Sequence, residues 1–464
     1  MLEAPPVLEA ILPRARPSGL GWSAPEGWGV SRLGELFDVQ QGKAISPRSR
    51  VNGSRRPFLR TSNVLWGHLA LDSLDTMVFS PEETKRLSLN RGDLLVCEGG
   101  DIGRTAVWGG EVPDCSYQNH LHRLRPRSTD TCPEFFMYWL QAAFTLFGTY
   151  AGAGNKTTIP NLSRSRLASL AVPIPTIAEQ RAIAEVLSNV QRAKEAAESV
   201  IVAAKELKKS LMRHLFTYGA VRVDAVERVR LTDTEFGSVP ATWEKFRLDE
   251  CATVQTGVAK GRKPSGGTLI SVPYLRVANV QDGYLELTEI KQIELEEREF
   301  RRYSLKPGDV LLTEGGDFDK LGRGFIWEGQ IPICVHQNHI FAVRPAPSRL
   351  LPKFLAFLVQ SPYGKAYFLQ VAHRTTHLAC INSTKLKAFP VVVPDLGEQE
   401  RIVRSLESVD EKVRSEERHS RAIQALFESL LDQLMSGLIR LAGPGQEGHG
   451  PEPAGTIAYG SSRR

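Results

Sequence analysis

The stretch that follows Pro175 carries the most regular hydrophobic pattern of the chain. Apolar residues recur there at alternating steps of three and four, which is the repeat of a coiled-coil seam. The predicted seam positions are Ile183, Val186, Val190, Ala193, Ala197, Val200, Ala204, Leu207 and Leu211. Thr176 and Glu179 have the spacing of a capping box, in which a hydroxyl and a carboxylate satisfy free backbone amides at a helix start. The pattern therefore predicts a helix over 176–218.

A second stretch, near the end of the chain, repeats this pattern. Asp395 and Glu398 have the same cap spacing, and the apolar steps predict a helix over 395–441. Its predicted seam comprises Ile402, Leu406, Val409, Val413, Ile423, Phe427, Leu430, Leu434 and Leu441, with Glu416, Ser420 and Gly437 at the remaining positions. Each helix is long enough to reach roughly 50 Å at the standard rise per residue. The two helices divide the chain into two similar halves.

The halves also share short motifs in the same order, which indicates an internal repeat. The motifs Trp28, Gly92-Asp93 and Gln118-Asn119-His120 return as Trp243, Gly308-Asp309 and Gln337-Asn338-His339. Short apolar runs such as 93–97 alternate with Gly/Pro turns and predict strands. Pro133–Phe147 and Pro352–Val371 are apolar at helical period. Each half is therefore predicted to be an α+β unit with one good helix packed on a twisted sheet.

Length and repetition together predict the organisation of the chain. A chain of 464 residues with 42% hydrophobic residues is too long for one core. We predict a leader, a unit, a helix, a linker, a unit, a helix and a tail, over residues 1–24, 25–175, 176–218, 219–239, 240–394, 395–441 and 442–464. Two copies of one unit tend to pair about a pseudo-twofold axis, which would set the helices antiparallel. The predicted fold class is α+β, with two similar domains joined by two long antiparallel coiled-coil helices in a pseudo-twofold internal repeat.

Composition excludes several classes of protein. No apolar run approaches the length of a membrane span, and the Pro-rich start lacks the order of a secretion signal, so a cytoplasmic protein without membrane contact is expected. The six cysteines form no C-x-x-C pair and no Cys/His cluster at zinc spacing, which favours buried reduced thiols. The net charge of +6 permits an anionic partner without requiring one.

The motifs offer no catalytic constellation. Ala151–Thr158 resembles a phosphate-binding loop, but Asn155 stands where that loop needs glycine. Glu98-Gly99-Gly100-Asp101 and its twin in the second half could hold a divalent ion between paired carboxylates. A tight turn with glycines at positive φ is the favoured interpretation, because no third ligand is near in the sequence. We predict no catalytic residues, no metal site and no cofactor bound by this chain.

A basic loop recurs at the same place in both halves. Segment 43–56 sets cations among Ser, Asn and Gly, and segment 258–272 does the same while differing nearly everywhere else. Such loops can follow a phosphate backbone and offer side chains to bases. A solvated surface loop is the alternative, but the recurrence favours a nucleic-acid contact. The predicted DNA-binding residues are Lys43, Arg48, Arg50, Arg55 and Arg56 in the first half and Lys260, Arg262 and Lys263 in the second.

Further polar spots shared by the halves extend this prediction. They are Lys156 and Thr157 with their counterparts Arg374 and Thr375, and Arg104 with Arg323 and the nearby Lys320. A cation beside hydroxyl groups suits a phosphate oxygen. The triplet Gln118-Asn119-His120 could read adenine, because Asn and Gln bond to the major-groove edge of that base. If the halves read different sequences, however, identical residues belong to the scaffold, which we favour for this triplet.

Together these features resemble the specificity subunits of type I restriction-modification systems. The resemblance covers Trp28 to about Leu441 and rests on the Gly-Asp-x-Leu strands, the unit-helix-unit-helix order and the duplicated helix starts. The helix starts place Glu179-Gln180 after Pro175 and Glu398-Gln399 after Pro394. The polar seam residues Glu416 and Ser420, the leader and the tail depart from the family pattern.

The resemblance implies a non-catalytic subunit in which each unit is a target-recognition domain that reads one half of a bipartite site in double-stranded DNA. The helices would set the spacer and bind two modification subunits, which use S-adenosylmethionine to methylate adenine at N6. Restriction subunits that use ATP and magnesium would join this core. The predicted partner-binding residues are Glu179, Gln180, Glu398 and Gln399, which carry the shared helix-start motif.

The helices also predict a fixed distance between the half-sites. Two reading units on successive turns of one DNA face lie about 10 base pairs apart, which leaves about 5 to 7 unread pairs if each unit reads about 3 to 5. One alternative is a two-domain coiled-coil scaffold for proteins or carbohydrate, which predicts no salt-sensitive DNA binding. Another is a self-sufficient methyltransferase or nuclease, which predicts turnover without partners.

Overall fold

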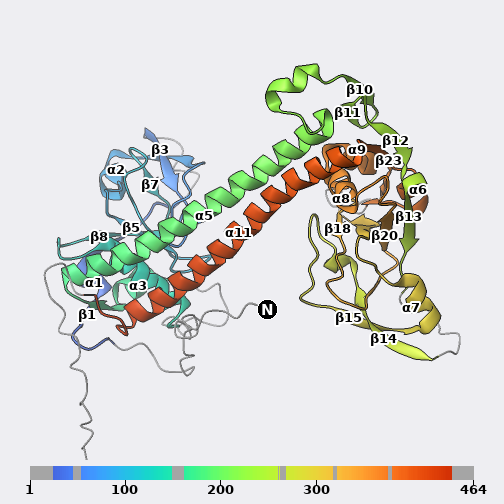
Figure 1. Cartoon of the computed structure of the whole chain (residues 1–464). Coiled ribbons are helices and arrows are strands. Elements are labelled where there is room, and N and C mark those ends of the chain that lie inside the picture. Colours follow the sequence, from blue (N-terminus) through green and yellow to red (C-terminus); the bar gives the residue numbers. More distant parts are fainter. Residues whose placement is uncertain are drawn as a thin grey trace, which may run out of the picture. The chain divides into compact units, whose positions relative to one another are not determined.

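The computed structural model describes residues 24–44, 54–148, 161–259, 261, 268–316, 321–374 and 379–441 (Figure 1). The chain forms two compact units. Unit 1 comprises Met1–Ala197 and His419–Arg464, and unit 2 comprises Glu198–Arg418. The predicted leader before Ala24 and the predicted tail after Leu441 lie outside the described residues.

Unit 1 contains a four-stranded antiparallel sheet and a three-stranded sheet. The first has the order β2 (Phe37–Gln41), β8 (Leu121–Pro126), β5 (Leu94–Cys97), β6 (Thr105–Val107), and the second the order β4 (Asp75–Phe79), β3 (Ser54–Leu59), β7 (Ser116–Tyr117). The strands β1 (Gly29–Arg32) and β9 (Ala171–Ile174) form a separate antiparallel pair. The short helices are α1 (Leu33–Leu36), η2 (Thr61–Asn63), α2 (Pro81–Leu87), α3 (Pro133–Thr145) and α4 (Arg164–Ala168).

Unit 2 contains counterparts of these sheets. Its four-stranded sheet has the order β13 (Ala252–Thr256), β20 (Ile340–Pro345), β16 (Val310–Thr313), β18 (Gly324–Ile326), and its three-stranded sheet the order β15 (Lys291–Glu296), β14 (Leu269–Leu275), β19 (Val335–His336). The strands β12 (Glu244–Arg247) and β23 (Pro390–Val393) pair as β1 and β9 do. The short helices are α6 (Leu248–Cys251), η4 (Val277–Asn279), α7 (Glu297–Tyr303), α8 (Pro352–Gln360), α9 (Pro362–Val371) and α10 (Ser383–Lys387).

Further strands of unit 2 form two small sheets. They are the hairpin β10 (Leu231–Thr234) and β11 (Gly237–Pro240), and the sheet β17 (Gly315–Gly316), β22 (Ala379–Cys380), β21 (His373–Arg374). The helix η3 (Val223–Arg228) precedes the hairpin. The segment 219–239, which we predicted to be a linker, is therefore a structured part of unit 2. Phe236 of the hairpin packs edge to face on Tyr363 and Tyr367 of α9, which holds the hairpin in place.

The central strand of each four-stranded sheet is buried on both faces. In β5, Val96 packs with α3 and the long helices, whereas Leu95 packs against the three-stranded sheet. Side chains alternate between the faces of a strand, so a strand covered on both sides is apolar throughout. In β16, Leu312 and Leu311 divide in the same way between two cores. The four-stranded sheet is thus the middle layer of each unit.

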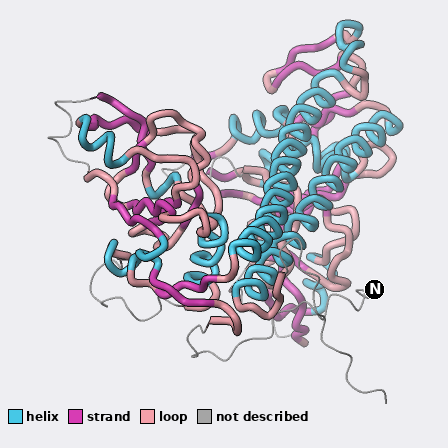
Figure 2. The backbone as a smooth tube through the Cα atoms, turned by 90° about the vertical axis from the view of Figure 1, so that its left-hand side faces the viewer, coloured by secondary structure: helices cyan, strands magenta, loops and turns pink. Residues whose placement is uncertain are grey.

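The long helices α5 (Ile177–Tyr218, 42 residues) and α11 (Leu396–Met435, 40 residues) each contribute one half to each unit. In unit 1, Ile183 near the start of α5 and Leu431 near the end of α11 belong to one core, and the two helices lie side by side (Figures 1 and 2). In unit 2, Lys205 pairs with Glu417 at 2.8 Å. Lys208 and Asp410 pair at 2.6 Å. The helices are therefore antiparallel within each unit.

Three of the nine predicted α5 seam residues, Ala193, Val200 and Leu207, are exposed. The line of buried and half-buried residues is Ile183, Leu187, Val190, Lys194, Ala197, Ile201, Ala204, Lys208, Leu211 and Leu215. Val200 and Leu207, which we placed in the seam, are 41% and 57% exposed. The apolar pattern misled because lysines occupy two interior positions. Lys208 can lie there because its aliphatic stem is buried while its ammonium group pairs with Asp410.

The α11 seam follows the prediction more closely, but the helix ends earlier. The buried seam residues are Ile402, Leu406, Val413, Phe427 and Leu434. The helix ends at Met435, before the predicted residue 441. Gly437 has a φ of +70°, a conformation that ends helices and that glycine adopts without strain.

Two further predictions require correction. The helix predicted over Pro352–Val371 is divided into α8 and α9. Pro362 lacks an amide proton and starts the second helix, and the Ser361 hydroxyl accepts a hydrogen bond from the Gly364 amide at 3.3 Å. The expectation that all thiols are buried is wrong for Cys380, which is exposed, whereas the other five cysteines are buried. Among the described residues, no helix has the length and apolar character that a membrane crossing requires.

Candidate nucleic-acid interface

In unit 1, one edge of the four-stranded sheet gathers the loops in which we predicted cations. The register joins Gln41 to His122, Cys97 to Leu121 and Val96 to Thr105. β2 and β5 therefore end, and β8 and β6 begin, at the same edge. Leu162, which follows the segment 149–160, also returns here, because its amide donates to the Glu98 carbonyl at 2.8 Å. We call this edge the loop edge of unit 1.

Unit 2 has a loop edge of the same construction. The register joins Thr256 to Phe341, Thr313 to Ile340 and Leu312 to Gly324. The Ile381 amide donates to the Glu314 carbonyl at 2.8 Å, as Leu162 does to Glu98. The fold thus brings the corresponding loops of both halves to equivalent edges, although they are far apart in the sequence.

The first loop can leave each edge only through a glycine. A Cβ atom on Gly42 would lie 2.2 Å from the Gln118 carbonyl oxygen, and one on Gly257 would lie 2.0 Å from the His336 carbonyl oxygen. Both distances are well below van der Waals contact. This close approach lets the start of the first loop run beside the triplet Gln118-Asn119-His120, which occurs in both halves. There the Asn119 amide donates to the Lys43 carbonyl at 2.8 Å. This geometry supports the favoured scaffold role for Gln118 and Asn119, whereas the side chain of His120 is exposed.

Glu98 lies at the centre of the loop edge of unit 1. Its carboxylate accepts hydrogen bonds from Gln41 Nε2 at 3.1 Å and Asn161 Nδ2 at 3.5 Å. His120 Nδ1 lies 3.7 Å from the same carboxylate. Glu98 is 7% exposed, and a buried carboxylate needs such donors because an unpaired charge in the interior is costly. The glutamate therefore joins segments that come from different parts of the sequence.

The loop edge of unit 2 repeats this pairing. His339 Nδ1 lies 2.5 Å from Glu314 Oε2. The side chains of His120 and His339 are 60% and 55% exposed, so each edge presents an accessible imidazole beside a carboxylate. The sequence held a signal for this pair, because both residues recur in the two halves, but we had assigned the glutamate to a turn and the histidine to the scaffold.

Below each loop edge lies a buried histidine. Burial lowers the pKa of His122, whose Nε2 lies 2.8 Å from the Leu162 carbonyl oxygen. Burial also lowers the pKa of His336, to about 4. Both rings are therefore neutral at pH 7 and add no positive charge to the edges.

Two of the predicted cations are neutralised within unit 1. Lys43 Nζ lies 2.5 Å from Glu83 Oε2 and donates to the Val78 carbonyl at 2.9 Å. Its side chain is only 11% exposed. Arg56 pairs with Asp114 at 2.7 Å. Lys43 thus fixes the start of the first loop to β4 and α2, and Arg56 of β3 has its partner at the surface, so the charge of each cation is balanced within unit 1.

Arg55 differs from these neighbours because its side chain is exposed. Its Nε and Nη2 donate to the Thr76 hydroxyl at 3.3 and 3.1 Å. A hydroxyl group is neutral, so the positive charge of Arg55 is directed to solvent without compensation from that partner. Of the loop cations that the structure describes, Arg55 has the position best suited to an outside phosphate.

Arg104 and Arg323 occupy equivalent, half-buried positions. Arg104 Nη2 donates to the Thr61 carbonyl at 3.1 Å, and Arg323 Nη2 donates to the Val277 carbonyl at 3.4 Å. Each therefore binds the loop edge to the short η helix that follows β3 or β14. Arg374 lies in β21. The predicted residues Arg48, Arg50, Lys156, Thr157, Lys260, Arg262, Lys263, Lys320 and Thr375 lie outside the described residues.

The glutamines of the helix starts are interior residues. Gln180 is 1% exposed and accepts a hydrogen bond from the Cys132 amide at 2.9 Å. Gln399 is 0% exposed and accepts one from the Leu351 amide at 2.9 Å. The prediction that these glutamines contact a partner is wrong, because another protein cannot reach enclosed side chains. They hold the start of each long helix to the loop before α3 or α8.

The capping prediction for the helix starts is half right. Thr176 Oγ1 accepts from the Glu179 amide at 3.3 Å, and Asp395 Oδ1 accepts from the Glu398 amide at 2.9 Å. The glutamates do not complete a capping box. Glu179 is 5% exposed and binds side chains of unit 1, and the half-buried Glu398 accepts from the Ala220 amide at 2.9 Å.

A buried ion pair that we had not identified braces each four-stranded sheet. Arg125 and Asp93 form a two-point pair at 2.8 and 2.7 Å. Arg344 and Asp309 repeat it at 2.6 and 2.7 Å. The repeated Gly-Asp and Arg-Pro motifs carried this signal in the sequence, but nothing in their spacing shows that the two motifs meet.

A model of the type I restriction modification DNA specificity domain matches residues 25–201 and 240–425 of the chain. The chain belongs to this family. It is therefore a DNA specificity subunit, which has no catalytic activity of its own and has a role in DNA sequence specificity.

Curated relatives agree over most of the chain. The StySPI specificity subunit of Salmonella potsdam is 23% identical over 403 residues, which cover 83% of this chain and 82% of the relative. The EcoKI specificity subunit of Escherichia coli K12 is 23% identical over 409 residues, with 83% and 82% covered. The MjaVIII specificity subunit of Methanocaldococcus jannaschii is 23% identical over 437 residues, with 91% and 95% covered.

Solved structures share the fold. The type I restriction-modification S subunit of M. genitalium aligns with a TM-score of 0.51 at 15% identity, covering 88% of this chain and 96% of that one. A chain from a structural study of complex assembly in a type I system aligns with a TM-score of 0.50 at 16% identity, covering 90% and 100%. At this level of identity the likeness concerns the mixed helix and sheet architecture of specificity subunits.

Proposed function

We propose that the two loop edges read the two halves of a bipartite site in double-stranded DNA, each unit acting as a target-recognition domain. One observation carries this proposal. The same edge, with the same register and a Glu-His pair, occurs in both units, while the first loop that leaves it differs in sequence between them. A constant framework with variable loops suits two domains that recognise different DNA sequences.

Positive charge at the edges would come from the variable loops. Lys43 and Arg56 are paired inside unit 1, so the contact with phosphates falls to Arg55 and to loop cations outside the described residues. Those cations are Arg48, Arg50 and Lys156 in the first half and Lys260, Arg262, Lys263 and Lys320 in the second, with Thr157, Arg374 and Thr375 as further polar groups. His120 and His339 are exposed at the edges and add hydrogen-bonding groups.

The long helices would act as the ruler of the complex. The helices pair antiparallel within each unit, and a spacer set by helix length rests on this pairing. Two modification subunits would dock on this part of the chain and use S-adenosylmethionine to methylate adenine at N6. Restriction subunits, which use ATP and magnesium, would join the assembly.

The proposal is tested by mapping N6-methyladenine in the genome of a host that carries this gene with its modification partner. Deleting the gene should remove one bipartite motif. A chimera that replaces residues 28–174 with the equivalent segment of a relative should change one half of the motif and leave the other half and the spacer intact. A motif that persists after deletion, or a chimera that changes both halves, would contradict the proposal.

The role of Arg55 has a separate test. Changing Arg55 to Ala removes one phosphate contact, so affinity for a duplex that contains the motif should fall about tenfold at low salt, and the slope of log affinity against log salt should fall by about one. Fluorescence anisotropy at several salt concentrations measures both. Arg222→Ala is the matched control, since Arg222 is an exposed arginine between α5 and η3, outside the strands and loops that form the loop edges. Equal affinities of wild type and Arg55→Ala would remove Arg55 from the interface.

A further inference from the structure

In unit 1, an arginine that follows α11 covers the start of α5. Arg440 donates to the Glu179 carboxylate from Nε at 2.6 Å and from Nη2 at 2.9 Å. Its guanidinium group lies over the Trp28 ring, 5.3 Å from the centroid. Trp28 Nε1 donates to the same carboxylate at 3.1 Å. The tryptophan and the glutamate thus form a built site for a guanidinium group, which combines a two-point ion pair with a cation–π contact.

Unit 2 contains the same frame around Trp243 and Glu398. The Trp28 amide donates to the Pro25 carbonyl at 3.1 Å, and the Trp243 amide donates to the Pro240 carbonyl at 3.0 Å. A glycine with positive φ follows the long helix in each unit and lies next to that proline, as Gly437 does in unit 1. Up to this glycine, the two units have equivalent backbone contacts.

Beyond the glycine the two units differ. Arg222 follows Gly219 at the same distance in sequence as Arg440 follows Gly437. Arg222, however, forms a two-point pair with Asp224 at 3.0 and 2.9 Å and is 85% exposed. The chain then continues into η3. Unit 2 therefore has the frame of the arginine site without the arginine of unit 1.

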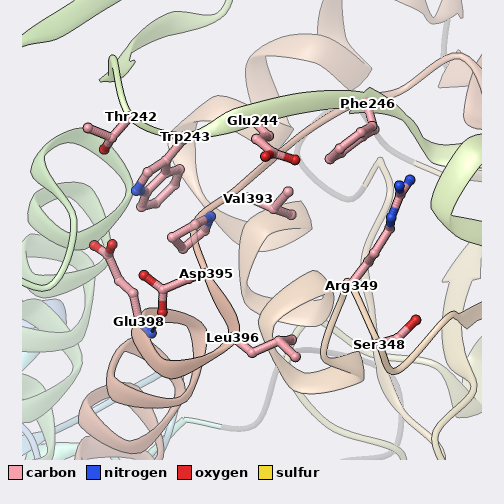
Figure 3. Close-up of a pocket in the computed structure, with 11 residues that line it drawn as sticks. Thr242, Trp243, Glu244, Phe246, Ser348, Arg349, Val393, Asp395, Leu396 and Glu398 are labelled. Carbon is pink, nitrogen blue, oxygen red and sulfur yellow. Dashed lines mark hydrogen bonds between the residues drawn. The ribbon is translucent and has the colours of Figure 1, made fainter.

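The equivalent place in unit 2 is an open pocket of about 350 Å³ (Figure 3). Figure 3 shows the Trp243 ring above the carboxylates of Asp395 and Glu398, with the indole nitrogen on the side of Glu398. Trp243 is 8% exposed, and its Nε1 has no hydrogen-bond partner among the described residues. We call this site the open pocket of unit 2.

We propose that the open pocket of unit 2 binds an arginine side chain of a partner protein. Its carboxylates, from Glu244, Asp395 and Glu398, outnumber its one lining cation, Arg349, which is stacked on Phe246 at 4.9 Å. This charge disfavours nucleic acid and favours a basic side chain. A planar guanidinium group suits the pocket better than an ammonium group because it can form a two-point pair while it lies on an aromatic ring. Unit 1 supplies its own ligand, and unit 2 leaves the position for another molecule.

The chemistry of the pocket is tested on the full chain with N-acetyl-arginine amide as the probe. The indole N–H resonance of Trp243, assigned with a Trp243→Phe variant, should shift on titration. N-acetyl-citrulline amide, which has the same shape without the charge, should bind at least tenfold more weakly. Glu398→Gln should weaken binding of the arginine probe by about tenfold. A Trp243 resonance that does not move, or that responds equally to both probes, would overturn the proposal.

Unit 1 provides the matched control. Arg440→Ala should open the equivalent site, so the Trp28 indole resonance should begin to respond to the arginine probe, whereas in the wild type it should not. Arg222→Ala distinguishes an internal occupant from an external one. If Arg222→Ala without any probe moves the Trp243 resonance, and adding the arginine probe to this variant moves it back, the chain fills its own pocket and the partner proposal is wrong.

The identity of the partner rests on the proposed function, in which modification subunits bind this chain. Glu398→Lys should reduce assembly with the modification subunit at least tenfold in analytical ultracentrifugation. DNA binding by the isolated chain should stay unchanged, because the pocket is not part of the loop edge. Equal assembly of wild type and Glu398→Lys would contradict this inference. A wild type that does not bind the modification subunit at all would instead contradict the proposed function.

Discussion

Units 1 and 2 share the four-stranded sheet, the three-stranded sheet and the strand pair beside the long helices, but they differ where the chain enters and leaves these helices. In unit 1, Arg440 closes the site formed by Trp28 and Glu179. In unit 2, the corresponding Trp243 and Glu398 line an open pocket. The frame around the tryptophan is thus repeated, whereas this difference lies where another molecule can reach. This is the distribution expected of a duplicated scaffold whose copies serve different ligands.

A second difference between the units lies in the core below the loop edges. Tyr117 of unit 1 corresponds to His336 of unit 2, and His122 of unit 1 corresponds to Phe341 of unit 2. All four side chains are buried. Each unit therefore buries one imidazole, but at a different position relative to the sheet. Because only the imidazole titrates in the acidic range, the two units should respond differently to acid.

The largest predicted effect tests whether the buried ion pairs are energetically equivalent. Asp309 is 0% exposed, binds Arg344 at two points and accepts from the Lys306 amide at 2.8 Å. Asp309→Ala leaves a guanidinium group and an amide without this partner, so unit 2 should lose about 3 kcal/mol of unfolding free energy. Asp93→Ala should cost unit 1 a similar amount. Hydrogen exchange read separately for each unit measures both losses.

Asp224→Ala is the control for this pair of variants. Asp224 forms a two-point ion pair of the same kind with Arg222, but this pair lies on the surface, where solvent screens the charges. Its removal should produce no measurable change in unfolding. Similar losses of unfolding free energy from Asp93→Ala and Asp309→Ala would show that the ion pair stabilises both units equally. A loss in one unit but not in the other would show that the same ion pair contributes differently to the stability of the two units.

The next prediction concerns pH. The pKa of His336 is lowered from its usual value near 6.5 to about 4 in the folded protein, so the unfolded state binds more protons between these values. The stabilising contribution is fully present above about pH 6.5 and is lost as the pH falls to about 4, with a total of about 3 kcal/mol. His336→Tyr, which introduces the residue of unit 1, should remove this pH dependence from unit 2.

Denaturant unfolding of wild type and His336→Tyr at pH 7 and pH 4.5 measures the effect as a difference between the two proteins. Other titrating groups contribute to both proteins and cancel in this comparison. From pH 7 to pH 4.5, the unfolding free energy of the wild type should fall relative to that of His336→Tyr. An unchanged difference would show that His336 does not titrate with a lowered pKa.

The sequence predicted the repeated architecture well but not the exact seam of α5. The caps at Thr176 and Asp395 are local signals, and both side chains accept the predicted amides. The seam failed at Val200 and Leu207 because lysines occupy interior positions. A hydrophobic pattern cannot reveal a lysine that is buried through its stem and paired with a distant Asp410.

The internal repeat indicated which loops correspond in the two units, but the individual contacts of the candidate interface could not be predicted. The recurrence of basic loops pointed to segments whose described ends lie at equivalent sheet edges. Whether a given cation is free depends on carboxylates far away in the sequence, as for Lys43 with Glu83 and Arg56 with Asp114. The same limit explains why Gln180 and Gln399, which share a motif, were assigned to a partner although they fill the interior.

A smaller effect tests the closed site of unit 1. Glu179 is 5% exposed, and Arg440→Ala leaves its carboxylate with the Trp28 indole but without the guanidinium group. The Arg440 side chain is 45% exposed, so solvent screening reduces the loss to about 1 to 2 kcal/mol. Arg222→Ala at the equivalent place in unit 2 should leave stability unchanged. If both variants destabilised equally, the contrast between a closed and an open site would be lost.

The smallest predicted effect separates two ion pairs of the helix pairing in unit 2. The side chains of Lys208 and Asp410 are 20% and 15% exposed, and Lys208 also lies over the Phe357 ring at 5.5 Å. Lys208→Ala should therefore cost about 1 kcal/mol of unfolding free energy. Lys205→Ala removes the more exposed pair with Glu417 and should cost only a fraction of that. Denaturant unfolding compares the two variants directly. Added salt should reduce the loss from Lys205→Ala further. It should leave most of the loss from Lys208→Ala, because a half-buried pair is screened less. Equal losses at low and high salt for both variants would show that the lysine at position 208 packs in the seam through its stem alone.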